Sequence, residues 1–378
     1  MTTLTFMTHT IFEHGASAQL GKVLAQHGLR RPLLCTDKGL VNLGMVDDLA
    51  AALGNDSALT VFDGTPENPT QAAVEEAVKK YIDADCDGVV ALGGGSSMDL
   101  AKAVALAVTH NGELIDYTAG LGGAAKIRQI APLIAIPTTS GTGSEVSSGA
   151  VIIMNNGEKL ILASKELVPR TAICDPSLTL GLPPQLTAAT GMDAMTHCIE
   201  ALLSPQINPP AEAVACDGIE RGIRDGNLVK AVQDGSDEDA RWHMMMAATE
   251  GAMAFSKGLG GVHSMSHACG ADQSLRLHHG TLNAVILPTI LDFNRDYVGA
   301  KYARLNAAMG ADADNDPAEF IRNLNSNIGL PENLSEMGVK KDSIPALAEH
   351  AAKDVCTFTN PRPCSKEEYE ALFEVALS

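Results

Sequence analysis

The sequence predicts a parallel α/β domain followed by an all-helical domain. In the first half, short β-rich runs alternate with helical stretches, which is typical of a parallel sheet covered by helices. From Pro183 onward the chain is rich in Ala, Met and Leu and has almost no β-branched runs, which favours helices. With 378 residues, the chain also exceeds what a single core comfortably holds. We therefore expect two domains, at 1–182 and 183–378.

Short apolar runs and helical spacing locate the expected elements. Strands are predicted at 31–36, 59–62, 88–92 and 132–136, and helices at 71–83 and 97–108. Two further β-rich runs surround Asn156-Gly157, and this dipeptide is typical of tight hairpin turns because both residues tolerate positive φ. In the second half, loops are expected at 204–210, 234–239 and 310–317.

Composition and charge argue against several classes of partner. The formal net charge of −19 does not suit nucleic acid or an anionic membrane, since neutralising phosphates requires clustered Lys and Arg. No apolar run approaches the roughly 18–20 residues that span a bilayer. The start of the sequence lacks the basic region and apolar stretch of a secretory signal. The eight cysteines form no C-x-x-C pair, as expected for reduced thiols, so we expect a cytoplasmic protein.

A glycine-rich turn joins the strand predicted at 88–92 to the helix that follows it. Gly93, Gly94 and Gly95 let the backbone approach a ligand closely, and the unpaired N–H groups of the helix start favour an anion such as pyrophosphate. The spacing differs from G-x-G-x-x-G, and glycine turns between strand and helix are common, so a purely structural role is equally open. The Lys-Ser/Thr pair of a P-loop does not follow.

A second turn of small hydroxylated residues contains Thr138 and Thr139 and follows the strand predicted at 132–136. Ligands of open α/β sheets bind outside the carboxyl ends of the strands, so both turns could contact one ligand. Asp37 follows the first predicted strand, where a carboxylate can bind an adenosine ribose and repel a 2′-phosphate, which predicts NAD in preference to NADP. The alternative interpretation of Asp37 is a turn-forming residue.

Histidines and one aspartate in the second half predict a metal site. Asp193 and His197 are four residues apart in a predicted helix, which places them on one face, although a surface pair would have the same spacing. Four of the eleven histidines crowd together, at positions 263, 267, 278 and 279. His263 and His267 are again four apart. Three imidazoles and one carboxylate suit Fe(II) or Zn(II) with a position open for a substrate oxygen, and residue chemistry does not separate the two metals.

Taken together, these motifs resemble the iron-containing, group III alcohol dehydrogenases nearly from end to end. The matching segments are TDKGL at 36–40, NPT at 68–70, GGGSSMDLAKA at 93–103, IPTTSGTGSEV at 136–146, LPPQLTAATGMDAMTHCIEA at 182–201, GLGGVHSMSHACGA at 258–271 and HGTLNAVILP at 279–288. The resemblance implies an NAD-binding α/β domain and a helical metal- and substrate-binding domain, the architecture shared with dehydroquinate synthase. It also implies a homodimer.

Carried over position by position, the resemblance assigns a role to each matching residue. The metal ligands are Asp193, His197, His263 and His279, and His267 is a catalytic residue near the nicotinamide that could relay a proton. The cofactor contacts are Asp37, Asn68, Gly94, Gly95, Ser96, Thr138, Thr139, Ser147, Lys159 and Leu178. The segment ADQSLRLHH at 271–279 is longer than in the simplest family pattern. His278 is therefore a rival of His279 for the fourth ligand position.

The predicted activity is that of a metal-dependent, NAD-linked alcohol dehydrogenase or aldehyde reductase. The metal would lower the pKa of the alcohol, and hydride would pass between the carbinol carbon and the nicotinamide. The expected substrate is a primary alcohol or an ω-hydroxy acid such as 4-hydroxybutyrate. Three alternatives are a maleylacetate-reductase-like enzyme, a dehydroquinate-synthase-like lyase and a catalytically silent NAD- or metal-binding protein.

Overall fold

The computed structural model describes residues 2–5, 8–53, 58–271, 275 and 277–378, and the chain divides into two compact units. Unit 1 comprises Met1–Thr139 and Gly143–Thr179, and unit 2 comprises Ser140–Thr142 and Leu180–Ser378. The short segment Ser140–Thr142 therefore belongs to unit 2, although the residues on either side of it belong to unit 1.

Unit 1 is built on a seven-stranded sheet. In spatial order its strands are β1 (Thr2–Thr5), β2 (His9–Phe12), β9 (Thr171–Cys174), β6 (Leu133–Pro137), β5 (Gly88–Gly93), β3 (Pro32–Cys35) and β4 (Thr60–Phe62). From β2 to β4 all neighbours are parallel, and β1 is antiparallel to β2. The predicted parallel α/β class is confirmed.

The predicted hairpin is a separate antiparallel pair of strands. It consists of β7 (Gly149–Ile153) and β8 (Lys159–Ala163), whose residues pair from Gly149 with Ala163 to Ile153 with Lys159. Gly157, in the turn between them, adopts a φ of 87°, which a residue with a side chain rarely accepts. The Asn-Gly pair thus marked the turn correctly.

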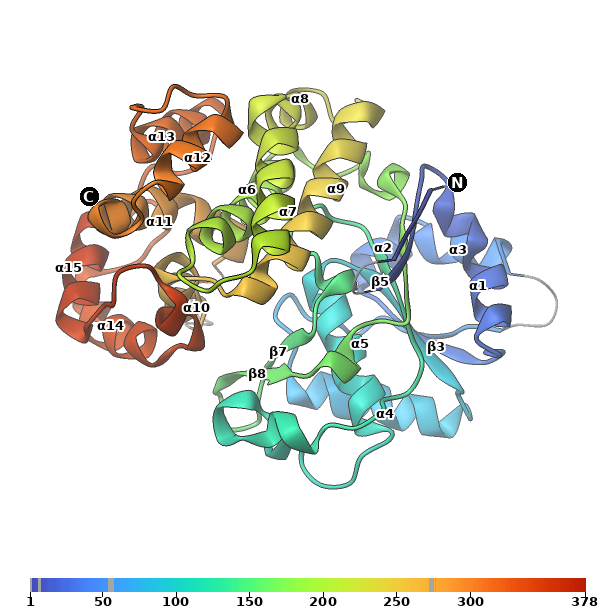
Figure 1. Ribbon diagram of the computed structural model, residues 1–378. Coiled ribbons are helices and arrows are strands. Elements are labelled where there is room, and N and C mark those ends of the chain that lie inside the picture. Colours follow the sequence, from blue (N-terminus) through green and yellow to red (C-terminus); the bar gives the residue numbers. More distant parts are fainter. Residues whose placement is uncertain (1, 6–7, 54–57, 272–274, 276) are drawn as a thin grey trace. The chain divides into compact units, whose positions relative to one another are not determined.

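Helices cover both faces of the sheet of unit 1 (Figure 1). They are α1 (Leu20–Gln26), α2 (Lys38–Asn42), α3 (Met45–Ala51), α4 (Gln71–Asp83) and α5 (Gly95–Ala107). Successive residues of a strand point to opposite faces, so Val89 packs in a core with α4 and α5, and Val90 packs in a second core with α1 and α3. Burial on both faces explains why these strands are apolar runs without alternation.

The described residues of unit 2 form helices and connecting loops, as predicted for the second half. The helices are α6 (Pro184–Leu203), α7 (Pro209–Ile219), α8 (Asn227–Gln233), α9 (Glu238–Ala254), α10 (Gly261–Gly270), α11 (His279–Asn294), α12 (Lys301–Met309), α13 (Pro317–Asn327), α14 (Ile344–Lys353) and α15 (Lys366–Ala376). Helix α6 packs against α7, α9 and α11 around one continuous core (Figure 1). Met244, Met245 and Met246 are buried, as expected of core residues.

Helix α6 carries polar side chains into the core of unit 2. Its first turn begins with Pro184, a position where the missing N–H costs nothing because it has no partner within the helix. From Thr187 to Leu203 every residue is buried, including Asp193, His197 and Glu200. Buried charged groups are stable only with polar partners, so these three side chains need such partners within unit 2. Within the described part of the chain, every helix is too short or too polar to cross a membrane.

Candidate functional site

Seven of the ten predicted cofactor residues follow strands at one edge of the sheet in unit 1. Strands β9, β6, β5 and β3 are neighbours and run parallel, so their carboxyl ends lie side by side. Leu178 follows β9, Thr138 and Thr139 follow β6, residues 94–96 follow β5, and Asp37 follows β3. Open parallel sheets bind ligands at this edge.

The turn between β5 and α5 requires glycine. Gly93 has a φ of 146°, and a Cβ there would lie 2.5 Å from Ser97 Oγ. A Cβ on Gly94 would lie 3.2 Å from Thr139 Oγ1, so the two predicted turns touch each other. Gly95 is the first residue of α5, whose leading N–H groups have no partner within the helix. The turn therefore offers backbone donors with little side-chain bulk around them.

Asp37 caps the start of α2. Its Oδ1 accepts hydrogen bonds from Gly39 N–H at 2.7 Å and Leu40 N–H at 3.1 Å. The turn-forming interpretation of Asp37 is thus correct as far as the local structure goes. Both bonds use Oδ1, so the cap does not by itself conflict with binding a ribose through Oδ2.

Two lysines donate hydrogen bonds to further predicted cofactor residues. Lys159 Nζ donates to Asn68 Oδ1 at 3.0 Å, and burial lowers the pKa of this lysine. Lys102 is fully buried, and its Nζ donates to Ser147 Oγ and to the carbonyl oxygen of Ser147, both at 3.0 Å. Burial lowers the pKa of Lys102 to about 8, although the nearby Asp99 opposes the shift. Asn68 and Ser147 are therefore fixed by contacts that the sequence did not indicate.

The four predicted metal ligands converge in unit 2. His197 Nε2 lies 3.8 Å from Asp193 Oδ1, and His279 Nε2 lies 3.7 Å from the same oxygen. Ligand atoms of Asp193, His197 and His263 all lie within 4.8 Å of one another, and these three residues are buried. His279 is partly exposed. Helices α6, α10 and α11 each contribute to this cluster.

The protonation of two histidines bears on whether the cluster fits a metal. Burial lowers the pKa of His197 to about 4, against the opposing charge of Asp193, so the ring is neutral at pH 7. Burial also disfavours the charged form of His263, but its hydrogen bond to Glu200 raises the pKa of this ring overall. Metal ligands are neutral imidazoles and ionised carboxylates, and a divalent cation displaces any remaining proton. The donor set fits a divalent cation.

Asn283 shows where the four ligands meet. Its Nδ2 donates to Asp193 Oδ1 at 2.7 Å and lies 3.3 Å from His263 Nε2 and 3.2 Å from His279 Nε2. Its buried Oδ1 has no hydrogen-bond partner among the described residues. Asn283 is not among the predicted site residues, although its position four residues after His279 in α11 was a usable signal.

His267 lies beside the cluster and has a carboxylate partner. Its ring stacks on that of His279 with 5.5 Å between ring centres. Its Nδ1 lies 2.9 Å from Asp354 Oδ2, and Cys356 completes a second group of potential metal-binding side chains. Burial opposes ionisation of Asp354, but the hydrogen bond with His267 lowers the pKa of Asp354 to about 2. Asp354 is 87 residues from His267 in sequence and is not among the predicted site residues.

The two candidates for the fourth ligand have different surroundings. His278 precedes α11, is exposed, and has its Nδ1 3.5 Å from Thr281 Oγ1. His279, the first residue of α11, is the one whose Nε2 approaches Asp193. The longer segment at 271–279 includes residues 272–274 and 276, which lie outside the described residues.

Two known protein families match different parts of this chain. Residues 7–176 match the family described as iron-containing alcohol dehydrogenase. Residues 187–377 match the family described as the C-terminal region of Fe-containing alcohol dehydrogenases. The two matches together span nearly the whole chain, and each covers most of one structural unit.

Full-length relatives agree with these matches. A 4-hydroxybutyrate dehydrogenase of Cupriavidus necator is 48% identical over 98% of this chain and 99% of its own length. A solved 1,3-propanediol oxidoreductase has a TM-score of 0.93 at 35% identity and covers 97% of both chains. A sulfoacetaldehyde reductase from Bifidobacterium kashiwanohense, solved in complex with NAD+, has a TM-score of 0.89 at 27% identity, covering 99% of this chain and 98% of its own. These matches confirm the resemblance carried by the motifs, and the chain belongs to the iron-containing alcohol dehydrogenase family and is an alcohol dehydrogenase.

Proposed function

We propose that this alcohol dehydrogenase interconverts 4-hydroxybutyrate and its semialdehyde, with NAD as the hydride carrier and Fe(II) as the metal. The observation that carries the proposal is the convergence of Asp193, His197, His263 and His279. Iron is supported by the family, and NAD by the sulfoacetaldehyde reductase solved with NAD+. The substrate is supported by the 4-hydroxybutyrate dehydrogenase that is 48% identical to this chain.

In the proposed metal site, the side chains supply metal-binding atoms that lie close to one another. Fe(II), when bound, lowers the pKa of the substrate alcohol, and the same donor set also accepts Zn(II). Burial keeps His197 neutral, so its lone pair is available without loss of a proton at pH 7. Asn283 donates to Asp193 Oδ1 and so fixes the orientation of the carboxylate.

In the proposed cofactor site, the edge of the sheet in unit 1 binds NAD. The turn at Gly94, Gly95 and Ser96 would receive the pyrophosphate, because the start of α5 offers unpaired N–H groups. Asp37 would accept a hydrogen bond from the adenosine ribose. The remaining proposed contacts are Asn68, Thr138, Thr139, Ser147, Lys159 and Leu178. The hydrogen bonds from Lys159 to Asn68 and from Lys102 to Ser147 would keep these contacts in place.

His267 is proposed to move the proton of the alcohol. Its Nδ1 is engaged by Asp354 Oδ2 at 2.9 Å, and a carboxylate can only accept a hydrogen bond. Nδ1 therefore carries hydrogen, and Nε2 is the nitrogen that can take up and release the proton. We propose the same division of roles as in other histidine–carboxylate pairs, in which the carboxylate orients the ring.

We also propose that the protein works as a cytoplasmic homodimer. All eight cysteines are free thiols, as suits a reducing compartment. Size-exclusion chromatography with light scattering tests the dimer, and a species with the mass of one chain at micromolar concentration would contradict it.

A substrate panel tests the proposed reaction. We expect Fe(II)-loaded enzyme to reduce NAD+ with 4-hydroxybutyrate at a kcat/KM at least about tenfold above that for 1,3-propanediol or ethanol, a typical margin for a pocket built for one substrate. Absorbance of the reduced nicotinamide gives the rates. A higher kcat/KM for either plain alcohol would contradict the proposed substrate but leave the enzyme class intact.

A ligand variant tests the metal site separately. His263→Ala should lose both bound iron and turnover, because it removes one of three imidazoles. His243→Ala is the matched control, since His243 lies in the same unit but contacts Asp239 and Arg221. Metal analysis and NAD-linked assays give the two readouts. Full activity of His263→Ala without metal would exclude the proposed chemistry.

A further inference from the structure

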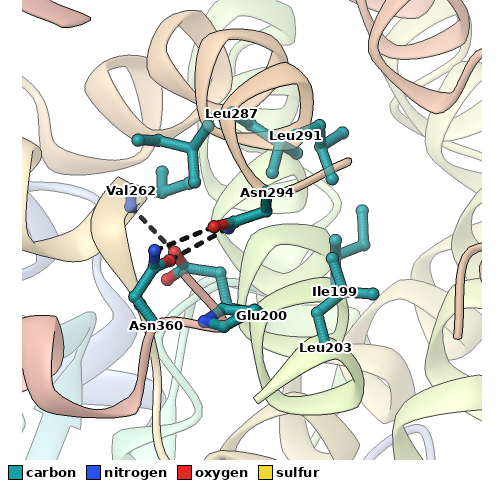
Figure 2. A pocket seen from close by; sticks show the side chains of 11 residues that line it. Ile199, Glu200, Leu203, Val262, Leu287, Leu291, Asn294 and Asn360 are labelled. Atoms are coloured by element: carbon teal, nitrogen blue, oxygen red, sulfur yellow. Dashed lines mark hydrogen bonds between the residues drawn. The ribbon is translucent and has the colours of Figure 1, made fainter. Parts of the chain in front are cut away.

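Glu200 is a buried carboxylate that the proposed reaction does not use. It lies in α6, and both of its oxygens are engaged. Oε2 lies 2.6 Å from His263 Nδ1, and Oε1 accepts a hydrogen bond of 2.8 Å from Val262 N–H. Figure 2 shows the second of these bonds, between two residues that line a small pocket inside unit 2.

The contact with Glu200 determines which nitrogen of His263 can bind a metal. A carboxylate accepts hydrogen bonds and donates none, so His263 Nδ1 must carry the hydrogen. The lone pair is then on Nε2, which lies 3.3 Å from Asn283 Nδ2 at the meeting point of the proposed ligands. Glu200 therefore selects the tautomer that a metal ligand needs.

We propose that Glu200 is a positioning residue for the metal, because it fixes the tautomer and the ring orientation of His263. This inference rests on the proposed metal site. A carboxylate that accepts a hydrogen bond from the second nitrogen of a metal-binding histidine fixes the orientation of the ring and raises its basicity. Loss of such a carboxylate typically lowers metal affinity about 10- to 100-fold. Glu200 is 5% exposed, so water does not compete strongly for its oxygens.

The start of α10 holds Glu200 in a defined place. A Cβ on Gly260 would lie 2.9 Å from Glu200 Oε1 and 2.8 Å from Asn360 Oδ1, so the backbone approaches both acceptors closely. Asn360 Oδ1 accepts from Gly261 N–H at 3.0 Å, and Asn360 is itself paired with Asn294 (Figure 2). The helix start thus has two buried acceptors, and Glu200 is the one that also contacts His263. Capping the helix and orienting the imidazole can therefore be separated by mutation.

The substitution Glu200→Gln keeps the shape of the side chain but changes its hydrogen bonding. If the amide oxygen stays on Val262 N–H, the NH₂ group faces His263 Nδ1 and favours hydrogen on Nε2, the wrong tautomer for binding. If the amide turns over, its NH₂ group meets Val262 N–H, and two donors oppose each other. We expect the dissociation constant for Fe(II) to rise about 10- to 100-fold, measured anaerobically by competition with a chelator. The electronic spectrum of the Co(II)-loaded variant should also differ from wild type.

Two controls separate this role from a general loss of structure. Asn360→Ala removes the other acceptor at the start of α10, so it should lower the unfolding temperature and leave Fe(II) affinity unchanged. Glu250→Gln replaces another largely buried glutamate of unit 2, which lies in α9 and pairs with Arg221 at 3.4 Å. This variant should leave Fe(II) affinity unchanged, whatever it does to the unfolding temperature.

The results of these measurements distinguish a role of Glu200 in metal binding from a role only in capping α10. Unchanged Fe(II) affinity in Glu200→Gln, or equal weakening in Asn360→Ala, would overturn the proposal. If Glu200→Gln does not fold, magnetic resonance of Zn(II)-loaded wild-type protein with isotope-labelled histidine gives the answer directly: hydrogen on Nδ1 of His263 supports the proposal, and a bare Nδ1 overturns it. None of these measurements needs substrate, so failure to oxidise 4-hydroxybutyrate would leave the test intact. A wild-type chain that binds none of these metals would overturn both the metal site and the role of Glu200.

Discussion

At the scale of single residues, a substitution of Asp37 can test the preference for NAD over NADP without lowering the stability of the protein. Asn caps a helix about as well as Asp, so Asp37→Asn should retain the bonds to Gly39 and Leu40. The substitution removes the negative charge that would repel a 2′-phosphate. We expect the ratio of kcat/KM for NAD+ to that for NADP+ to fall about tenfold, the effect of roughly 1.4 kcal/mol. An unchanged ratio, with unchanged unfolding temperature, would remove Asp37 from the cofactor site.

Asp354 gives a prediction about stability and pH. Burial raises its pKa, but the hydrogen bond with His267 outweighs burial and lowers the folded-state pKa from 3.8 to about 2. Above about pH 5 the carboxylate is ionised in both folded and unfolded chains, so its stabilisation is fully present. As the pH falls from about 5 to 2, the unfolded chain takes up the proton first and the stabilisation is lost.

The variant Asp354→Asn lacks this titration. The difference in free energy of unfolding between wild type and variant should therefore shrink by about 2 kcal/mol from pH 5 to pH 2. Urea unfolding across this pH range measures it. A difference that stays constant with pH would show that the bond to His267 does not lower the pKa of Asp354.

Sequence spacing indicated some residues of the candidate site and not others, for a physical reason. Asp193 and His197, like His263 and His267, are one helical turn apart, and this spacing is visible in any sequence. Glu200 is 63 residues from His263, and Asp354 is 87 residues from His267. These pairs form only because separate helices pack together, so neither spacing nor residue type indicated them.

At the scale of elements, Gly280 tests how closely α11 packs on α6. A Cβ on Gly280 would lie 2.2 Å from the carbonyl oxygen of Ala189 and 3.2 Å from Asp193 Cβ. Gly280→Ala must therefore push the two helices apart beside the proposed ligands. We expect a loss of about 1–3 kcal/mol in free energy of unfolding, as for other overpacked cores, together with weaker Fe(II) binding.

The matched control for this variant is Gly181→Ala in the same unit. A Cβ on Gly181 meets nothing within 4 Å, and its φ is not positive, so stability and metal binding should stay within about 0.5 kcal/mol of wild type. Unfolding in urea and chelator competition measure both variants. If Gly280→Ala matched this control in both measurements, the close approach of α6 and α11 would not be needed for the site.

The prediction of elements succeeded where the local pattern was long or specific. The helix predicted at 71–83 has those bounds in α4, and Asn156-Gly157 lies between the two strands of the hairpin. Strands β1, β2 and β9 were not predicted. Each has four residues, and a short apolar run does not by itself separate strand from other structure. Strand β2 also pairs with β9 far along the chain, so its place depends on the whole sheet.

At the scale of the whole molecule, the residues proposed to bind Fe(II) and those proposed to bind NAD lie in different units. The proposed metal ligands all lie in Leu180–Ser378, and the proposed NAD contacts all lie in Met1–Thr139 or Gly143–Thr179. A ligand stabilises the structure that binds it in proportion to the logarithm of its concentration over Kd, about 2.7 kcal/mol at a hundredfold excess. Metal and cofactor should therefore protect different segments of the chain.

Hydrogen exchange with mass spectrometry tests this separation. Fe(II) should slow exchange most in α6, α10 and α11, by up to about a hundredfold for amides that exchange through unfolding of that unit. NAD+ should slow exchange most in the turns after β3, β5 and β6. In His263→Ala the effect of Fe(II) should disappear and that of NAD+ should persist, because this variant changes only the metal site. Protection by Fe(II) centred on the turn between β5 and α5 would contradict the assignment of the metal to unit 2 and would place it among the residues proposed for NAD.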